Sequence, residues 1–234
     1  MKEIKITPRL RAVASFVKKC KTVADIGTDH GFIPVYLIQN GLCENAIASD
    51  INIGPLNSAV KTAQTHGVSD KIEFVHAPGL EGISDGAADT VIIAGMGGET
   101  IIGILSEAEW LKAHRTHVIL QPQSKLENLA DFLSDNGYEV LGAKLVKDAG
   151  RLYIVLSISY TGSTDKSGLY FADMLKNDEL FSEYLTGIAK QLTLRLKGLE
   201  NANNADEAEL EKCRYELGLL NKMLLEAESD GNCK

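Results

Sequence analysis

The stretch Val23-Ala-Asp25-Ile-Gly27-Thr28-Asp29-His30-Gly31 decides how the chain folds. The apolar residues over 22–26 predict a buried β-strand, and the glycines after it predict a tight turn that opens a helix. Such a turn brings backbone N–H groups and a helix N-terminus close to a ligand. The stretch lacks the Gly-x-Gly-x-x-Gly spacing of dinucleotide-binding folds and places an acidic residue two positions before its first glycine. It therefore predicts a ligand site of another kind at a strand end.

The same order of strand, glycine turn and helix repeats along the chain as far as residue 159. Further strands are predicted at residues 45–49, 72–76, 90–94, 118–121, 139–147 and 152–159, and helices at 34–39, 56–65, 100–105 and 126–136. The last two strands are joined by Asp148-Ala-Gly-Arg151, which is too short for a crossover helix, so these strands are antiparallel neighbours. The pattern predicts an α/β fold with a doubly wound, mostly parallel sheet of seven strands, one of them antiparallel. In such sheets ligands bind beyond the carboxyl ends of the strands.

The sequence changes character after a polar break at residues 161–164. Beyond it β patterns are absent, and apolar residues recur at steps of three and four in two segments, which is typical of helices that pack along one seam. The seam residues are Phe181, Leu185, Ile188, Leu192, Leu196 and Leu199, followed by Leu210, Cys213, Leu217, Leu220, Leu224 and Ala227. We therefore expect two domains: residues 1–161 form the α/β domain, and residues 162–234 form an antiparallel helical hairpin of the coiled-coil type.

The first helix carries a concentration of positive charge. Residues 1–21 hold seven Lys and Arg against one Glu, although the whole chain has a net charge of −8. Thr7-Pro8 predicts the start of the helix, whose apolar residues then recur three and four positions apart. Arg9 and Arg11 lie off that apolar stripe, so we expect both on an outer basic surface that binds a polyanion. A solvated helix face is the alternative explanation.

Composition limits the class of protein. Hydrophobic residues make up 44% and charged residues 24% of the chain, which is typical of a globular protein. No apolar run approaches the roughly 20 residues of a membrane span, and the first residues contain no apolar signal core. We therefore expect a cytoplasmic protein with no membrane partner. The four cysteines show neither Cys-x-x-Cys pairing nor a nearby His, so we expect free thiols and no metal site.

Two further motifs lie at predicted strand ends. Asp50 closes the second strand, where its carboxylate can accept hydrogen bonds from both hydroxyls of a ribose. Gly95-Met96-Gly97-Gly98 follows the fourth strand, and its glycines leave space for a planar base to approach the main chain. Simpler explanations exist for each motif: Asp25 as a buried helix-capping carboxylate, Asp50 as a turn residue, and the glycine run as a tight turn.

The motif Asp25-x-Gly27-x-x-x-Gly31 is similar to the S-adenosylmethionine loop of class I methyltransferases, and Asp50 is similar to their ribose-binding acid. Together with Gly95–Gly98 and Gln121-Pro122, these motifs resemble the TrmK family, the bacterial tRNA (adenine-N1)-methyltransferases that modify an adenine on the D-loop side, adenine 22. The resemblance extends over nearly the whole chain. It implies a Rossmann-like methyltransferase sheet, S-adenosylmethionine as the cofactor and tRNA as the partner. The sequence indicates no particular protein partner.

Two positions depart from the pattern of these families. Asp29 stands where class I enzymes usually have glycine, although it fits the TrmK family. Pro78 stands where we expect the Asp of a Gly-Asp-Gly-Leu turn that contacts the adenine of the cofactor. We therefore expect backbone groups at Gly79-Leu80, in place of a side chain, to contact that adenine.

The motifs and the resemblance together assign roles to residues near the predicted strand ends. The expected cofactor-binding residues are Asp25, Gly27, Thr28, His30, Gly31, Asp50, Ile51, Gly79, Leu80, Ala94, Gly95 and Met96. The expected substrate-binding residues are Arg9, Arg11, Gly97, Gly98, Gln121, Arg151 and Tyr153. A stacked adenine must be flipped or exposed before it is methylated. We expect Tyr153, Phe32 or Tyr36 to stack against it.

The chemistry that the resemblance implies is methyl transfer to a ring nitrogen. Adenine N1 carries a lone pair and no proton, so the reaction needs no general base and rests on alignment, desolvation and charge stabilisation. Asp29 is the catalytic candidate, because a carboxylate would stabilise the positive charge of the product. The alternative is that Asp29 only orients the loop or the methionine end of the cofactor. The amide of Gln121 or Gln123 is expected either to read the edge of the adenine or to be a turn residue.

Two other functions are compatible with the sequence. A class I methyltransferase that acts on a small metabolite would suit the acidic net charge, but it leaves the basic first helix without a role. A non-catalytic module that uses its hairpin for protein association is the second alternative.

Overall fold

The computed structural model describes residues 2–164, 168–202 and 206–231. The chain divides into two compact units, residues 1–166 and 167–234. The first unit therefore continues a few residues beyond the polar break at 161–164. Hydrogen bonds hold this segment to the α/β unit, since Thr161 and Gly162 each donate a backbone N–H to the carbonyl of Gly137 at 3.0 Å, and the Ser134 hydroxyl donates to the carbonyl of Thr164 at 3.3 Å.

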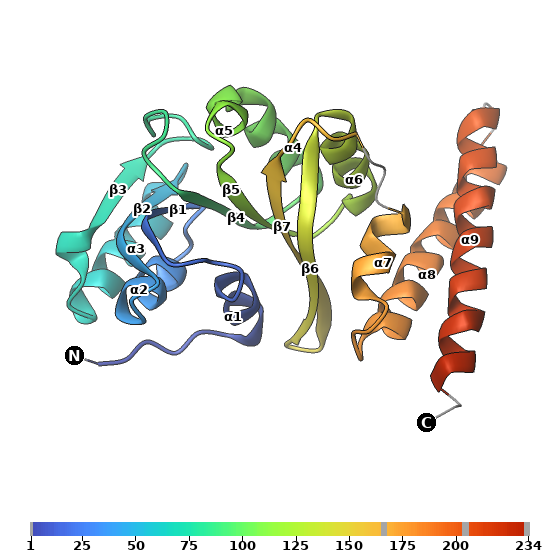
Figure 1. Cartoon of the computed structure of the whole chain (residues 1–234), viewed down its shortest axis with the longest axis horizontal. Coiled ribbons are helices and arrows are strands. Elements are labelled where there is room, and N and C mark those ends of the chain that lie inside the picture. The colour runs from blue at the N-terminus through green and yellow to red at the C-terminus, as the bar shows by residue number, and fades with distance from the viewer. Residues whose placement is uncertain (1, 165–167, 203–205, 232–234) are drawn as a thin grey trace. The chain divides into compact units, whose positions relative to one another are not determined.

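The α/β unit contains a seven-stranded sheet (Figure 1). Its strands are β1 (Cys20–Ile26), β2 (Cys43–Asp50), β3 (Ile72–His76), β4 (Thr90–Met96), β5 (His117–Pro122), β6 (Tyr138–Asp148) and β7 (Arg151–Tyr160). Their order in the sheet is β3-β2-β1-β4-β5-β7-β6. Only β7 is antiparallel to its neighbours, so the predicted mostly parallel sheet with one antiparallel strand is confirmed.

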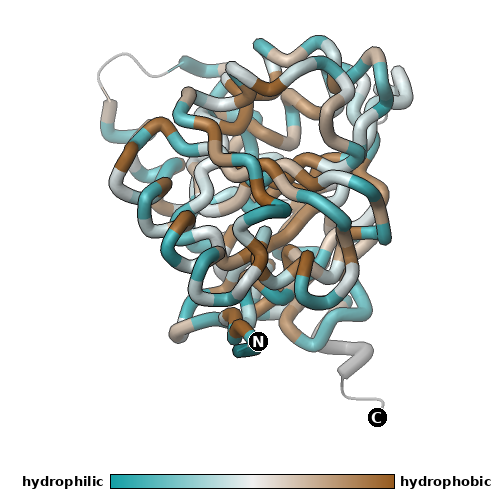
Figure 2. The backbone as a smooth tube through the Cα atoms, turned by 90° about the vertical axis from the view of Figure 1, so that its left-hand side faces the viewer, coloured by the Kyte–Doolittle hydropathy of each residue, from teal (hydrophilic) through white to brown (hydrophobic). Residues whose placement is uncertain are grey.

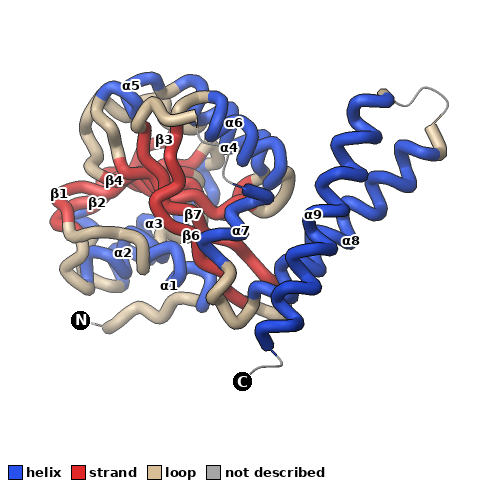
Figure 3. The backbone as a smooth tube through the Cα atoms, turned by 45° about the vertical axis from the view of Figure 1, so that its right-hand side comes forward, coloured by secondary structure: helices blue, strands red, loops and turns tan. Residues whose placement is uncertain are grey.

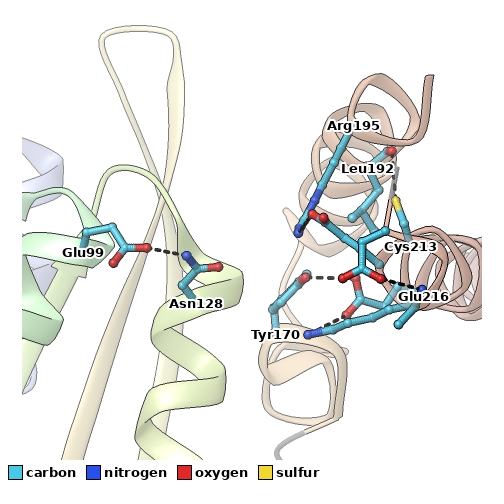
Figure 4. Close-up of polar contacts among 11 residues, drawn as sticks. Glu99, Asn128, Tyr170, Leu192, Arg195, Cys213 and Glu216 are labelled. Atoms are coloured by element: carbon cyan, nitrogen blue, oxygen red, sulfur yellow. Dashed lines mark hydrogen bonds and ion pairs between the residues drawn. The ribbon is translucent and has the colours of Figure 1, made fainter. Parts of the chain in front are cut away.

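Helices cover both faces of the sheet (Figures 1 and 3), which confirms the doubly wound architecture. One face carries α1 (Pro8–Ala14), α2 (Phe32–Gln39) and α3 (Ile53–Thr65), and the other carries α4 (Gly98–Glu107), α5 (Glu109–Ala113) and α6 (Leu126–Asp135). A short 3-10 helix, η1 (Ser69–Lys71), precedes β3. A hydrogen bond from Asn128 to Glu99 connects α6 to α4 (Figure 4).

The core follows from this layering. Parallel strands that are covered on both faces must be apolar along their whole length, and the central strands β1, β4 and β5 contain runs of fully buried Val, Ile and Leu. In Figure 2 hydrophobic stretches of the chain, coloured brown, run through the inside of the molecule. The polar residues of the same strands are therefore confined to the strand ends, and this places the site.

The first helix begins as predicted and turns one arginine inward. Pro8 is its first residue, and the Thr7 hydroxyl accepts the backbone N–H of Leu10 as the N-cap. The helix ends at Ala14, earlier than the apolar stripe indicated, although Val17 is still buried. It packs against β5, β6 and β7. This contact makes Arg9 half-buried, whereas only Arg11 is exposed as expected.

The second unit is an antiparallel helical hairpin that follows two short helices. Its elements are η2 (Gly168–Phe171), α7 (Ala172–Leu175), α8 (Phe181–Glu200) and α9 (Glu207–Gly231). Arg195 pairs with Glu209 at 2.7 Å, and the Cys213 thiol donates to the carbonyl of Leu192 at 3.4 Å (Figure 4). The predicted seam residues are buried or half-buried. The sequence did not predict η2 and α7; Phe171, the last residue of η2, is buried, and η2 packs against α7 and α9.

None of the helices in the described part of the chain has the length and apolar character needed to cross a membrane. Cys20, Cys43 and Cys213 are free thiols, and Cys233 lies outside the described residues.

Candidate active site

The predicted site residues lie where the strands β2, β1, β4 and β5 end side by side, together with the turn between β6 and β7. The parallel pairing puts Ile26 beside Ser49 and Ile93 on its two sides. The turns that follow these strands therefore open at one edge of the sheet, which is the expected ligand position in such folds.

The turn after β1 is held against the end of β2. The backbone N–H groups of Gly27 and Thr28 both donate to the carbonyl of Ser49, at 2.8 and 2.9 Å. Gly27 has a φ of +71°, and a side chain there would overlap the methyl group of Met96 at the end of β4. The positive φ favours glycine at this position, and the flexible Met96 side chain from the end of β4 lies against it.

Asp25 is a buried carboxyl group at the end of β1. Burial raises its pKa from 3.8 to about 6; the nearby Thr28 hydroxyl opposes this rise, and the charge of Asp50 adds to it. The Thr28 hydroxyl is itself buried, and it has no hydrogen-bond partner among the described residues. Such unsatisfied buried groups are costly unless a ligand completes them.

Asp50, the last residue of β2, is also buried. One of its carboxylate oxygens accepts the backbone N–H of Asn52 at 2.7 Å, which fixes the orientation of the carboxylate. Its other oxygen has no partner among the residues that the structure describes. Ile51 beside it is 62% exposed, an unusual exposure for a large apolar side chain at a strand end.

Asp29 and His30 lie on the outer side of the same turn. The Asp29 carboxylate is 76% exposed and lies 3.4 Å from Nε2 of His30. The imidazole stacks on the Phe32 ring, with the centroids 5.4 Å apart and the planes 16° from parallel. Phe32 is exposed, and Tyr36 is half-buried.

The turns after β4 and β5 pack on each other through their main chains. Gly98 donates its backbone N–H to the carbonyl of Ser124, and Gln123 donates its own to the carbonyl of Met96, both at 2.8 Å. A side chain at Gly98 would overlap the carbonyl oxygens of Ser124 and Lys125. The glycine run thus permits the close approach of two loops, and the pairing of β4 with β5 is irregular between Ala94 and Met96, around the exposed Gly95.

Arg9 reaches this second pair of loops from α1. Its Nη1 donates to Oε1 of Gln121 at 2.7 Å, and its guanidinium lies over the Tyr153 ring, 5.7 Å from the centroid. Gln121 is fully buried and its Nε2 donates to the carbonyl of Pro122 at 2.8 Å, so both ends of its amide are engaged within the protein. Gln123 is exposed beside Gly95. Of the two glutamines predicted to read the adenine, Gln121 is therefore engaged within the protein, whereas the side chain of Gln123 is exposed.

The remaining predicted residues lie around this edge. Gly79 has a φ of +52° in the loop after β3 and packs on Ile104, and Leu80 is buried. Arg151 is exposed at the start of β7. Within the described ranges, no group of three or more His, Cys, Asp and Glu side chains is arranged to hold a metal ion.

Comparison with known proteins agrees with this geometry. A family model for a methyltransferase domain matches residues 6–156. The tRNA (adenine(22)-N(1))-methyltransferase of Bacillus subtilis (strain 168) is 33% identical over 165 residues, 70% of this chain and 69% of that protein. The chain belongs to the TrmK family. The B. subtilis TrmK crystal structure matches with a TM-score of 0.81 and 26% identity over 95% of this chain and 100% of that one. M. capricolum TrmK in complex with S-adenosyl-homocysteine matches with a TM-score of 0.76 and 25% identity over 94% and 97%.

As a TrmK-family member, the chain is an S-adenosylmethionine-dependent methyltransferase, and its site fits this cofactor. Asp25 and Asp50 are acceptors without cationic partners, suited to an amino group and a ribose diol, and the unpartnered Thr28 hydroxyl faces the same region.

Two contacts of Arg9 were not predicted from the sequence. Asp148, at the end of β6, accepts the backbone N–H of Arg9 at 3.3 Å, and this contact joins residues 139 positions apart. The engagement of Gln121 by Arg9 was also missed, because periodicity places a side chain on or off a helix face without identifying its partner.

Proposed function

We propose that this chain methylates N1 of adenine 22 in tRNA, with S-adenosylmethionine as the methyl donor. The observation that carries the proposal is the division of the site: buried carboxylates at the β1 and β2 ends adjoin a glycine-lined surface at the β4 and β5 ends. The first half suits a cofactor with a ribose and an amino group. The second half suits a planar base, since Gly95 is exposed and carries no side chain of its own.

Asp50 and Asp25 hold the cofactor in this proposal. The free oxygen of Asp50 accepts a ribose hydroxyl, while Asp25 and Thr28 face its cationic methionine end. When bound, S-adenosylmethionine supplies an electrophilic methyl group. The adenine N1 needs no base because its lone pair is free, so the chain aligns the base and excludes water.

Asp29 stabilises the positive charge that develops on the methylated ring. Of the two carboxylates in the 25–31 turn, Asp25 is buried and Asp29 is exposed toward solvent, from which the base must arrive. Gln123 reads the edge of the adenine through its exposed amide, beside Gly95. Phe32 and its stacked His30 offer an aromatic surface for a neighbouring base.

The helical unit contributes to tRNA binding. We place the boundary between the catalytic unit and this RNA-binding unit between residues 161 and 167. The basic residues of the hairpin that the sequence suggested are Lys190, Arg195, Lys197, Arg214 and Lys222. Arg195 and Arg214 pair with Glu209 and Glu200, whereas Lys190 and Lys197 are exposed and have no ion pair among the described residues. Chains ending at residue 164 should bind cofactor and lose tRNA affinity.

The test is transfer of labelled methyl groups from S-adenosylmethionine to unmodified tRNA, followed by primer extension. A methyl group on N1 blocks base pairing, so reverse transcription should stop at position 22 and pass in a tRNA with guanine there. Transfer of the labelled methyl group to a small metabolite, when tRNA is left out, would support the metabolite alternative. Transfer to neither tRNA nor a metabolite would favour the non-catalytic binding module. A tRNA substrate agrees with a cytoplasmic location.

A further inference from the structure

Arg9 is a half-buried cation whose charge the protein leaves unbalanced. Both partners of its guanidinium, the Gln121 amide and the Tyr153 ring, are neutral. Asp148 accepts the backbone N–H of Arg9, and among the described residues no carboxylate forms an ion pair with the guanidinium. Long charged side chains that are removed from water are normally paired. A guanidinium has five N–H donors, and Gln121 uses one of them.

The guanidinium is held in one orientation before a ligand arrives. Gln121 is fully buried and also bonded to the Pro122 carbonyl, so its oxygen cannot turn away from Arg9. Tyr153 supports the flat face of the group, and the contact with Asp148 fixes its backbone. A group that is ordered in advance loses less conformational freedom on binding, and a partly desolvated charge is less screened than a surface one.

The position of Arg9 identifies the part of the substrate that it meets. A Cβ atom built on Gly95 would lie 3.4 Å from Nη1 of Arg9 and 3.6 Å from Nε2 of Gln123, so both groups border the surface on which the base is expected to rest. The methylated ring is cationic, so a guanidinium against N1 would oppose the reaction. The anionic group that accompanies an adenine is its phosphodiester, which the fork of an arginine binds in two places.

We propose that Arg9 binds a phosphate that flanks the target adenine and so holds the nucleotide out of its stack, over Gly95. Gln121 and Tyr153 are positioning residues that act through Arg9. This inference rests on the proposed function, since it requires an RNA substrate. It differs from the expectation that Arg9 belongs to a diffuse basic surface, because one defined phosphate is now its partner.

The first test compares variants by tRNA affinity against salt and by single-turnover methyl transfer. Arg9→Ala should reduce the log–log salt slope by about 0.7 to 0.9, the value for one lost phosphate contact, and slow transfer at saturating tRNA 10- to 100-fold. Arg9→Lys should restore the slope and only part of the rate, because it keeps the charge without the fork. Gln121→Met should keep the salt slope and lower the rate, since the guanidinium of Arg9 remains but loses the hydrogen bond that orients it.

Two controls accompany these variants. Lys19→Ala removes an exposed charge from the same segment and should keep the parent rate. Unchanged cofactor affinity by calorimetry is the control for folding.

The decisive test uses tRNA with a neutral methylphosphonate in place of the phosphate on the 5′ or the 3′ side of adenine 22. One of these linkages should slow the wild-type enzyme 10- to 100-fold and leave Arg9→Ala no slower than it is on normal tRNA, because the two changes remove the same contact. Equal slowing of both proteins, or a wild-type enzyme that is insensitive to both linkages, would overturn the proposal. The wild-type comparison needs no variant to fold. A wild-type enzyme that fails to methylate normal tRNA would instead refute the proposed function.

Discussion

The cofactor side and the base side of the site differ in what the protein offers to a ligand. At the turns after β1 and β2, polar side chains are buried and incompletely paired, namely Asp25, Thr28 and Asp50. At the turns after β4 and β5, glycines remove side chains, and the surface consists of main chain with the amide of Gln123 and the guanidinium of Arg9 at its border. The cofactor side selects its ligand by directional hydrogen bonds and charge. The base side selects its ligand by shape and by the oriented guanidinium of Arg9. Substitutions should therefore separate cofactor affinity from methyl transfer.

The largest effect is expected for Gly98→Ala. The new methyl group would overlap the backbone carbonyls of Ser124 and Lys125, which cannot move as a flexible side chain would. The loop that carries Gln123 should shift, lowering the free energy of unfolding by about 2–3 kcal/mol, as for an overpacked core, and methyl transfer should fall more than 100-fold. Cofactor affinity should change little, since this loop belongs to the base side.

Gly103→Ala is the matched control for that variant. It lies in the same helix, α4, and a Cβ there meets nothing within 4 Å. Because alanine favours a helix over glycine by about 1 kcal/mol, this variant should be as stable as the parent or more so, with normal methyl transfer. Equal behaviour of the two variants in thermal unfolding and in the transfer assay would contradict the close packing of the two loops.

The second largest effect is the contribution of Asp25 to the pH dependence of the free energy of unfolding. A folded-state pKa near 6, raised by burial above the ordinary 3.8, disfavours the charged form in the fold. The wild-type protein should therefore lose stability as pH rises from about 4 to about 6, by up to roughly 3 kcal/mol relative to Asp25→Asn, and the difference should stay constant above that range. Denaturant unfolding of both proteins at several pH values measures it. Parallel pH profiles would show that Asp25 is not the group responsible.

Binding of the cationic cofactor should lower the raised pKa of Asp25 part of the way toward its ordinary value. Calorimetry at pH 6 in buffers of different ionisation enthalpy should detect protons released by the wild-type protein on cofactor binding, and none from Asp25→Asn. The same variant should bind cofactor more weakly, because it loses a carboxylate that faces the cationic end.

Asp50→Ala should weaken cofactor binding by roughly 1.5–3 kcal/mol, the usual cost of losing a charged hydrogen-bonding partner, while the sheet stays folded. Asp89→Ala is the control, since that carboxylate accepts backbone N–H groups of Lys21 and Thr22 at the opposite end of β1. It should cost stability without changing cofactor affinity. A calorimetric titration in which the folded Asp50→Ala protein binds as tightly as the parent would remove Asp50 from the site.

The smallest effect is expected for Asp29→Ala. Its carboxylate is mostly exposed, so solvent screens its charge, and loss of a screened interaction corresponds to about a tenfold decrease in rate or less. Single-turnover transfer should slow while cofactor affinity remains near that of the parent. If affinity collapses and the transfer rate holds, Asp29 orients the cofactor instead.

The comparison also explains what the sequence could predict. The succession of strands and helices and the antiparallel pairing of the last two strands follow from local signals, because apolar runs and short connections each act within a few residues. The side-chain contacts on the base side could not be predicted from such local signals. Gln121 was a candidate base reader and is instead buried against Arg9, a contact between residues 112 positions apart. Helix periodicity placed Arg9 off the apolar stripe, but only packing against β5–β7 turned its guanidinium inward.

The same long contacts have a consequence for protein synthesis. Arg9 leaves the ribosome 139 positions before Asp148, to which its backbone is bonded. A nascent chain that has completed β1 and β2 already contains Asp25 and Asp50, and α1 can pack against α2, but the contacts of α1 with β5, β6 and β7 cannot form until those strands have been made. Contacts so distant in sequence form late in folding, because closing a long loop comes before any gain from the contact. During its own translation the chain should thus acquire cofactor binding first, and competence to act on RNA only when the α/β unit is nearly complete.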